Sequence, residues 1–334
     1  MSIAGATSPL RAARLRSRAE LSHHPRLVAR VAAELLARGA DGPEVARLVA
    51  RMNDALVRRL LSWARAELGP APAPWAWLAF GSEGRMEQTL LTDQDNALVY
   101  ADEGEASRAW YAALAERVNA DLVAAGIPEC SGGHMAKLEH GPLARWVRRF
   151  AACVDRPDAH DAEILLDRRR IAGRLSLEPL EAEIARGAGA PLLLRSLAVE
   201  ALELSPPSPL LLSLRRGGTE VDVKRHGISP IVFLARCHGL EAGATSGPTL
   251  ARLAAAREAG LLSAEVHAAI AGAYRFVLGL QLRVQLRAIE AGEPPTNKVR
   301  LAALTSPERA SLASAFRTVK RWQTRAAWHY QAVT

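Results

Sequence analysis

Cysteine is scarce in this sequence, and its arrangement argues against two kinds of cross-link. The three cysteines are Cys130, Cys153 and Cys237, an odd number with no CxxC pair among them. A disulfide framework needs paired cysteines, and structural zinc sites usually take closely spaced pairs, so we expect neither. Unpaired thiols are typical of a reducing compartment, and we predict a cytoplasmic location.

Lysine and aromatic residues are also scarce. Only four of the 43 basic residues are lysines, the other 39 are arginines, and aromatic residues make up 5% of the chain. The formal net charge is +8, but the arginines are dispersed and often interleaved with glutamate. A nucleic-acid surface usually gathers its basic residues on one face, beside aromatic side chains. The arginine bias is therefore better explained by a GC-rich genome, and nucleic acid is not an expected partner.

Long apolar runs are missing as well. A membrane-spanning helix needs about 20 consecutive apolar residues. The best candidate, Ala271–Leu286, is interrupted by Arg275 and Arg283. The first 20 residues are rich in arginine and lack the apolar centre of a secretory signal. We therefore expect no membrane insertion and no membrane partner.

Helical patterning, by contrast, is abundant. The length of 334 residues suggests two domains, and 49% hydrophobic with 23% charged residues is ordinary globular composition. Residues 1–69 are interpreted as a helical N-terminal segment. In its second half Asp41 can cap a helix that ends at Gly69, and apolar residues recur between them at spacings of three and four. His23 and His24 belong to no catalytic pattern, and we expect both to be solvated.

After a proline-rich linker at 70–74, the pattern predicts a small mixed-sheet core over residues 70–175. Three short apolar runs are typical of buried strands: 75–80, 97–100 and 164–166. Two amphipathic helices are expected within the same core: 105–125 and 143–154.

Residues 176–334 are predicted to form a mostly helical C-terminal domain. Six helices are expected, near 179–186, 191–204, 229–241, 247–259, 263–290 and 306–330. One exception, with strands at 210–214 and 219–223 around Arg-Arg-Gly-Gly, has the shape of a β-hairpin. The fold class expected for the whole chain is therefore α+β.

The most informative segment is Phe80–Tyr100, FGSEGRMEQTLLTDQDNALVY. An apolar strand runs into Gly81-Ser82, where small residues let backbone amides approach a phosphate closely. Asp93 and Asp95 stand just before the next strand. Positions i and i+2 of an extended chain point to the same face, so both carboxylates can meet the same ions. Oxygen ligands combined with substrate phosphates suit Mg²⁺, or Mn²⁺ in its place.

These residues carry a family resemblance. The Gly-Ser…Asp-x-Asp arrangement is similar to the polymerase-beta-type nucleotidyltransferase superfamily. The longer string GSEGRMEQTLLTDQDNALVY resembles a bacterial signal-transduction family of nucleotidyltransferases. Members are often fused to CBS and cyclic-nucleotide-binding domains and are related to protein uridylyl- and adenylyltransferases. Downstream, VDVKRHGISPIVFLAR resembles the start of that family's helical substrate-binding domain, and together the resemblance covers roughly residues 45–330.

The resemblance implies a third carboxylate from a later strand. Asp167, at the end of the expected strand 164–166, is the candidate; the alternative is a strand-end aspartate paired with the arginines that follow it. The superfamily usually has apolar residues where this chain has Gln94 and Asn96, a departure that the closer family shares. A glycine-rich loop of the family is matched by Cys130–Met135, and it passes near the nucleotide or forms a plain turn.

Two basic residues are candidates for binding the phosphates. Arg85 follows the Gly-Ser turn closely enough to reach a triphosphate, where a guanidinium can grip two oxygens and Glu87 could orient it. The alternative is an arginine on a helix surface. Lys224 and Asp222 alternate with valines, so they share a face of the expected hairpin. Lys224 then contacts phosphate or acceptor, or lies in solvent.

Together these residues predict a Mg²⁺-dependent nucleotidyltransferase. It would move a nucleoside monophosphate from a nucleoside triphosphate such as ATP to a hydroxyl of a regulatory protein or small molecule, releasing pyrophosphate. The catalytic and metal-binding candidates are Asp93, Asp95 and Asp167, and the nucleotide-binding candidates are Gly81, Ser82, Arg85 and Lys224. The alternative is a nucleotide-responsive signalling module with little or no turnover. A nucleic-acid-binding protein has only the net charge in its favour.

Overall fold

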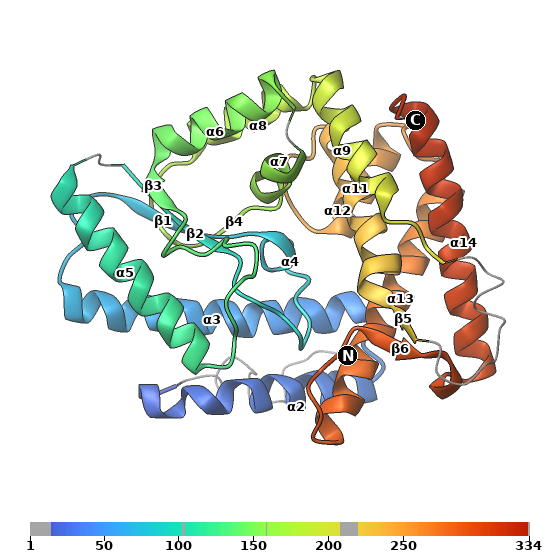
Figure 1. The fold of residues 1–334 in the computed structure, drawn as a ribbon, viewed down its shortest axis with the longest axis horizontal. Coiled ribbons are helices and arrows are strands. Elements are labelled where there is room, and N and C mark those ends of the chain that lie inside the picture. The colour runs from blue at the N-terminus through green and yellow to red at the C-terminus, as the bar shows by residue number, and fades with distance from the viewer. Residues whose placement is uncertain (1–14, 102–103, 158, 208–219, 333–334) are drawn as a thin grey trace. The chain divides into compact units, whose positions relative to one another are not determined.

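The computed structural model describes residues 15–101, 104–157, 159–207 and 220–332, and Figure 1 shows the elements along the chain. The chain divides into two units. Unit 1 comprises residues 1–40, 44–148 and 167–179, and unit 2 comprises residues 41–43, 149–166 and 180–334. No helix in the described part of the chain is both long enough and apolar enough to span a membrane.

Unit 1 contains a four-stranded sheet with the strand order β3-β2-β1-β4. The strands are β1 (Trp75–Ala79), β2 (Asn96–Tyr100), β3 (His140–Pro142) and β4 (Arg169–Gly173). Strand β1 runs antiparallel to both β2 and β4, whereas β2 and β3 are parallel. The predicted mixed sheet and its two neighbouring buried strands are therefore confirmed, and so is the α+β fold class.

The helices of unit 1 are η1 (Arg18–His23), α2 (His24–Ala37), α3 (Gly42–Leu68), α4 (Gly81–Gly84) and α5 (Glu105–Ala124). Of these, η1, α3 and α5 contribute buried apolar side chains to one core with the sheet (Figure 1). Alternate residues of β1 and β2, such as Trp77 and Leu98, enter one core with apolar side chains of α3 and α5. A one-residue slip would turn these side chains away from the core, so the core fixes the register. That register pairs Ala79 with Asn96. The turn after β1 therefore lies beside the segment that precedes β2.

Unit 2 is mostly helical, as predicted. Its helices are α7 (Ala159–Leu166), α8 (Glu178–Gly187), α9 (Pro191–Glu203), η2 (Lys224–Ile228), α11 (Ser229–Glu241), α12 (Thr249–Glu258), α13 (Ala264–Glu290), η3 (Leu301–Ala303) and α14 (Ser306–His329). The six helices expected here are all present, within two residues at each end. Helix α6 (Leu143–Asp155), also predicted, contributes residues to both units.

The predicted strand 164–166 is wrong. These residues form the end of α7, and the strand of this region is β4, which begins two residues after Asp167 rather than before it. Ala162, Leu165 and Leu166 are all buried, and spacings of three and four place them on one helical face. A short apolar run cannot be assigned to strand or helix by periodicity alone, which is the reason for the error.

The predicted hairpin is replaced in part by a different pairing. Its first strand, 210–214, lies outside the described residues. Glu220–Asp222 forms β5, which pairs antiparallel with β6 (Lys298–Arg300). Lys224 does not continue the strand, because η2 begins there and Asp222 accepts a hydrogen bond from the Arg225 amide at 2.9 Å. The expected strand alternation of Asp222 and Lys224 is therefore wrong.

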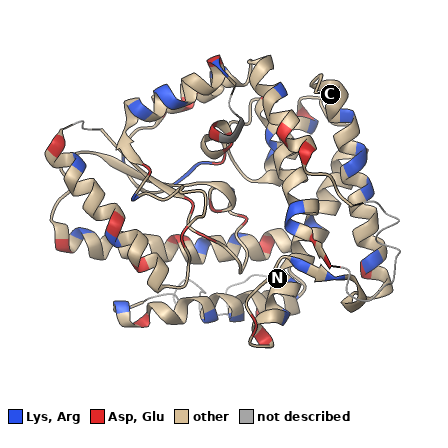
Figure 2. Cartoon of the chain, in the orientation of Figure 1, with Lys and Arg blue, Asp and Glu red and all other residues tan. Residues whose placement is uncertain are grey.

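Charged side chains are distributed along the helices of both units. In Figure 2, Lys and Arg in blue occur along most of the described helices, and Asp and Glu in red lie among them on several. Several of these residues pair across exposed surface, such as Arg117 with Glu67 at 3.6 Å. Such exposed pairs contribute little to stability, typically about 0–1 kcal/mol each.

Candidate metal and nucleotide site

Asp93 and Asp95 lie in the irregular segment between α4 and β2, and their carboxylates meet a thiol. Oxygens of Asp93 and Asp95 and the Sγ of Cys130 all lie within 4.8 Å of one another, and all three residues are partly exposed. The two carboxylates are together, as alternation in an extended segment predicts. Two carboxylates are a donor set that suits Mg²⁺ or Mn²⁺, and the thiol adds a softer donor. A metal-binding role for Cys130 was not predicted, because its spacing from the aspartates matches no metal-binding motif.

The Gly-Ser turn packs directly against this cluster. The Phe80 amide donates to the Asp95 carbonyl at 2.8 Å, so the turn and the aspartate segment are joined by their backbones. Gly81 has a φ of +54°, and a Cβ placed on it would lie 2.8 Å from Oδ2 of Asp95. Only glycine combines this left-handed backbone with so close an approach. The small residue predicted to admit a phosphate therefore also makes room for the Asp95 carboxylate.

Gln94 and Asn96 anchor the aspartates from the buried side. Both are about 1% exposed. The side-chain Nδ2 of Asn119 donates to Gln94 Oε1 at 2.6 Å and to Asn96 Oδ1 at 3.0 Å. The backbone amides of Gln94 and Asn96 donate to the carbonyls of Pro128 (3.0 Å) and His134 (2.9 Å). These two bonds flank Cys130 in the sequence, so the Cys130 loop is held to the aspartate segment on both sides. Gln94 and Asn96, which stand where the superfamily has apolar residues, therefore serve to hold the aspartate segment through buried hydrogen bonds.

Replacing Asn119 by Ala should destabilise the protein by roughly 3 kcal/mol. The change leaves Gln94 Oε1 without this donor and the Lys137 backbone amide without its acceptor, Asn119 Oδ1 at 2.8 Å. Asn96 Oδ1 keeps the bond from the Ala136 backbone amide at 2.8 Å. Each unsatisfied buried group costs about 1–3 kcal/mol. Urea unfolding gives the free energy, and hydrogen exchange of the Lys137 amide should accelerate. Glu116→Ala, on the exposed face of the same helix, should stay within about 0.5 kcal/mol of the original protein. Equal effects of the two changes would contradict this account.

Asp167 lies in a second, buried group of charges. Arg85 donates from Nη1 to Asp167 Oδ2 at 2.5 Å and from Nε to Glu87 Oε2 at 2.7 Å. The three side chains are at most 10% exposed. Glu87 orients Arg85 as expected, and Arg85 is not an arginine on a helix surface. Within the described residues, the potential metal-binding group contains Asp93, Asp95 and Cys130, and Asp167 is not part of it.

The start of β4 is locked to the Gly-Ser turn. A Cβ on Gly84 would lie 1.6 Å from the carbonyl oxygen of Asp167. Arg169 forms a bidentate pair with Asp54, both bonds 2.8 Å long, and donates to the Glu83 carbonyl at 2.9 Å. Burial, followed by repulsion from Asp54, raises the pKa of the Glu83 carboxyl to about 8. Glu83 is therefore mostly neutral at pH 7, and Arg169 fixes the turn through its backbone.

A chain of hydrogen bonds connects the N-terminal helices to the aspartate segment. His24 Nε2 lies 2.8 Å from Asn53 Oδ1, Asn53 donates to Gln88 at 3.0 Å, and Gln88 donates to Thr92 at 3.3 Å. His24 is 3% exposed, and burial lowers its pKa. The expectation that His24 is solvated is therefore wrong. The N-terminal segment thus supports the residue that precedes Asp93.

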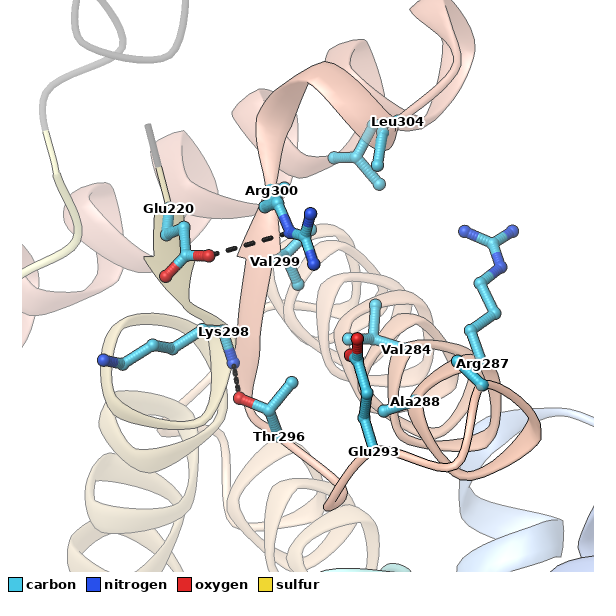
Figure 3. Close-up of a pocket in the computed structure, with 12 residues that line it drawn as sticks. Glu220, Val284, Arg287, Ala288, Glu293, Thr296, Lys298, Val299, Arg300 and Leu304 are labelled. Carbon is cyan, nitrogen blue, oxygen red and sulfur yellow. Dashed lines mark hydrogen bonds and ion pairs between the residues drawn. The ribbon is translucent and has the colours of Figure 1, made fainter. Parts of the chain in front are cut away.

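Lys224 is an exposed residue of unit 2, whereas the other predicted site residues belong to unit 1. Unit 2 has its own hollow of about 320 Å³, between α13 and the β5–β6 sheet (Figure 3). Arg287 and Arg300 bring positive charge to its wall, Glu220 and Glu293 bring negative charge, and Arg300 lies 3.8 Å from Glu220 (Figure 3). Lys224 does not line this hollow, and its role stays a prediction.

Two family models match the chain. The model described as "Putative nucleotidyltransferase DUF294" matches residues 26–160, which include both aspartates, the Gly-Ser turn and Cys130. The model described as "Putative nucleotidyltransferase substrate binding domain" matches residues 191–330. No curated protein matches the chain. The chain belongs to this nucleotidyltransferase family, with its substrate-binding domain, as the resemblance implied. Asp167 lies between the two matched regions.

Proposed function

We propose that this protein is a Mg²⁺- or Mn²⁺-dependent nucleotidyltransferase. It would transfer a nucleoside monophosphate from a nucleoside triphosphate to an acceptor hydroxyl and release pyrophosphate. One observation carries the proposal: the carboxylates of Asp93 and Asp95 lie together, directly against the Gly81-Ser82 turn. The family supports the class of reaction, and three cysteines that form no disulfide favour the cytoplasm.

Each part of the site has a task in this reaction. Asp93 and Asp95 would hold the divalent ion, which when bound neutralises phosphate charge and aligns the attacking and leaving oxygens. Gly81 lacks a side chain and Ser82 has a short one, so the triphosphate can approach the backbone of the turn. The bonds of Gln94 and Asn96 keep the carboxylates in position before substrate binds, and such preorganisation avoids reorganisation during reaction.

Asp167 is proposed as the third carboxylate ligand of the ion. In the structure its carboxylate is paired with Arg85, so this role requires that Arg85 release it. Either Arg85 moves from Asp167 to the triphosphate when substrate binds, or Asp167 acts only by fixing Arg85. The two cases differ in Asp167→Asn. A ligand role predicts weaker Mn²⁺ binding, measured by calorimetry without nucleotide. A role confined to Arg85 leaves Mn²⁺ affinity unchanged and weakens nucleotide binding instead.

The acceptor is proposed to be a hydroxyl of a regulatory protein or a small molecule, bound by the substrate-binding domain. Within that domain, the hollow beside β6 offers a polar wall with charges of both signs, from Arg287 and Arg300 and from Glu220 and Glu293. Lys224, also cationic and exposed, is proposed to contact phosphate or acceptor.

The experiment that tests the function uses α-³²P-labelled ATP, UTP, GTP and CTP with Mg²⁺ or Mn²⁺ and a cell lysate. Label transferred to a protein band or a small molecule supports the enzyme and identifies the nucleotide. Asp95→Asn is the matched inactive variant, and any label that it also transfers is background. Metal-dependent nucleotide binding without transfer to any lysate component would overturn the enzyme and support a nucleotide-responsive binding module.

A further inference from the structure

Cys130 differs from the other groups of the candidate site in being a sulfur donor in a tightly built turn. The Gly132 amide donates to its Sγ at 3.3 Å, and the Gly133 amide donates to its carbonyl at 3.1 Å. A Cβ on Gly132 would lie 3.5 Å from the same Sγ. This turn, flanked by the two bonds to the aspartate segment, presents the thiol to the carboxylates of Asp93 and Asp95.

We propose that Cys130 is a third donor to the ion held by Asp93 and Asp95. The ion would then cover the thiol, and thiophilic ions would compete with Mg²⁺ for the site. The inference rests on the proposed function for its biological meaning, but it can be tested without nucleotide or turnover.

The spacing of the donors supports one shared ion. Ligand atoms bind Mn²⁺, Co²⁺ or Zn²⁺ at about 2.0–2.3 Å, so two ligands of one ion lie at most about 4.6 Å apart. The three donors are within 4.8 Å of one another, which is close to this limit.

The donor set predicts which ions are preferred. Mg²⁺ is hard and gains nothing from sulfur, whereas Co²⁺ and Zn²⁺ bind thiolate well and Mn²⁺ is intermediate. The original protein should therefore bind Co²⁺ and Zn²⁺ more tightly than Mg²⁺. Cys130→Ser should lose most of that preference while retaining Mg²⁺ binding through the two carboxylates.

The first test is a titration of the full chain with Co²⁺ alone, because thiolate bound to cobalt absorbs in the near ultraviolet. We expect the charge-transfer band in the original protein and in Cys153→Ser, and its loss in Cys130→Ser. Cys153 is the matched control, since it is 3% exposed and its thiol donates to the Arg149 carbonyl at 3.3 Å. A band that persists in Cys130→Ser, or a protein that binds Co²⁺ without any band, overturns the proposal.

The second test measures alkylation of Cys130 by iodoacetamide, followed by peptide mass spectrometry. Only the ion-free fraction reacts if the ion covers the thiol, so Mn²⁺ at about ten times its Kd should slow alkylation about tenfold. The Asp95→Asn variant should lose this protection. Unchanged alkylation of the original protein at saturating Mn²⁺ would overturn the proposal.

The failures of the two proposals are distinguishable. If the cobalt band is present but no nucleotidyl transfer is found, Cys130 is confirmed as a donor and the proposed enzyme activity is rejected. If Mg²⁺-dependent transfer is found without the band and without protection from alkylation, the enzyme activity is confirmed and the role of Cys130 as a donor is rejected.

Discussion

Replacing Asp93 or Asp95 by Asn is expected to lower metal-dependent nucleotidyl transfer about 100-fold or more. Each change removes one charged ligand and keeps the side-chain volume nearly constant. Charge stabilisation by a bound ion contributes several kcal/mol to the transition state, and each 1.4 kcal/mol corresponds to about tenfold in rate. The loss should fall on the chemical step and on metal affinity together.

The same replacements should leave the fold intact. Without an ion, the two carboxylates lie close together and repel each other. Removing one charge relieves this repulsion, so the ion-free variants should be equal to or slightly more stable than the original protein. Nucleotide binding without Mg²⁺ should change little, because the Gly81-Ser82 turn and Arg85 are unaltered.

The measurements are a thermal shift and a transfer assay, each with and without Mg²⁺. Asp155→Asn is the matched control, an aspartate whose side chain is 67% exposed in an ion pair with Arg186. It should retain full transfer. Undiminished Mg²⁺-stimulated transfer in Asp93→Asn and Asp95→Asn, or wholesale unfolding of either, would reject the assignment of these aspartates as ion ligands.

Replacing Gly84 by Ala is expected to be the most destabilising single methyl addition near the site. The new Cβ would lie 1.6 Å from the Asp167 carbonyl oxygen and 2.9 Å from the Ala79 carbonyl oxygen. Both contacts are with backbone, which cannot rotate away as a side chain can. Overpacking typically costs about 1–3 kcal/mol and more where the backbone must shift, so we expect at least about 3 kcal/mol. At about 2–4 °C per kcal/mol, Tm should fall by roughly 10 °C.

Gly272→Ala is the matched control, because nothing lies within 4 Å of a Cβ at this position in α13. Alanine is the better helix former by about 1 kcal/mol, so this change should raise stability slightly. Differential scanning calorimetry compares the two variants with the original protein. If Gly84→Ala unfolds at the original Tm, the contact between α4 and the start of β4 is looser than these distances indicate.

Much of the fold could be predicted from local patterns. The longer helices were expected because apolar residues at spacings of three and four specify a buried helical face wherever that face packs. The runs 75–80 and 97–100 were assigned to strands, since short apolar runs between turn residues fit a buried sheet. The strand assigned to 164–166 failed because three apolar residues fit a strand and a helix equally well.

The candidate site, like the fold, was predictable from the sequence only in part. The sequence determined the Gly81-Ser82 turn and the pairing of Asp93 with Asp95, because both depend only on neighbouring residues and the geometry of an extended chain. Tertiary structure alone decided that Cys130 joins the aspartates and that Asp167 pairs with Arg85. These contacts join residues 35 or more positions apart. They depend on strand register and on buried hydrogen bonds such as those of Asn119, which no local pattern of side chains reports.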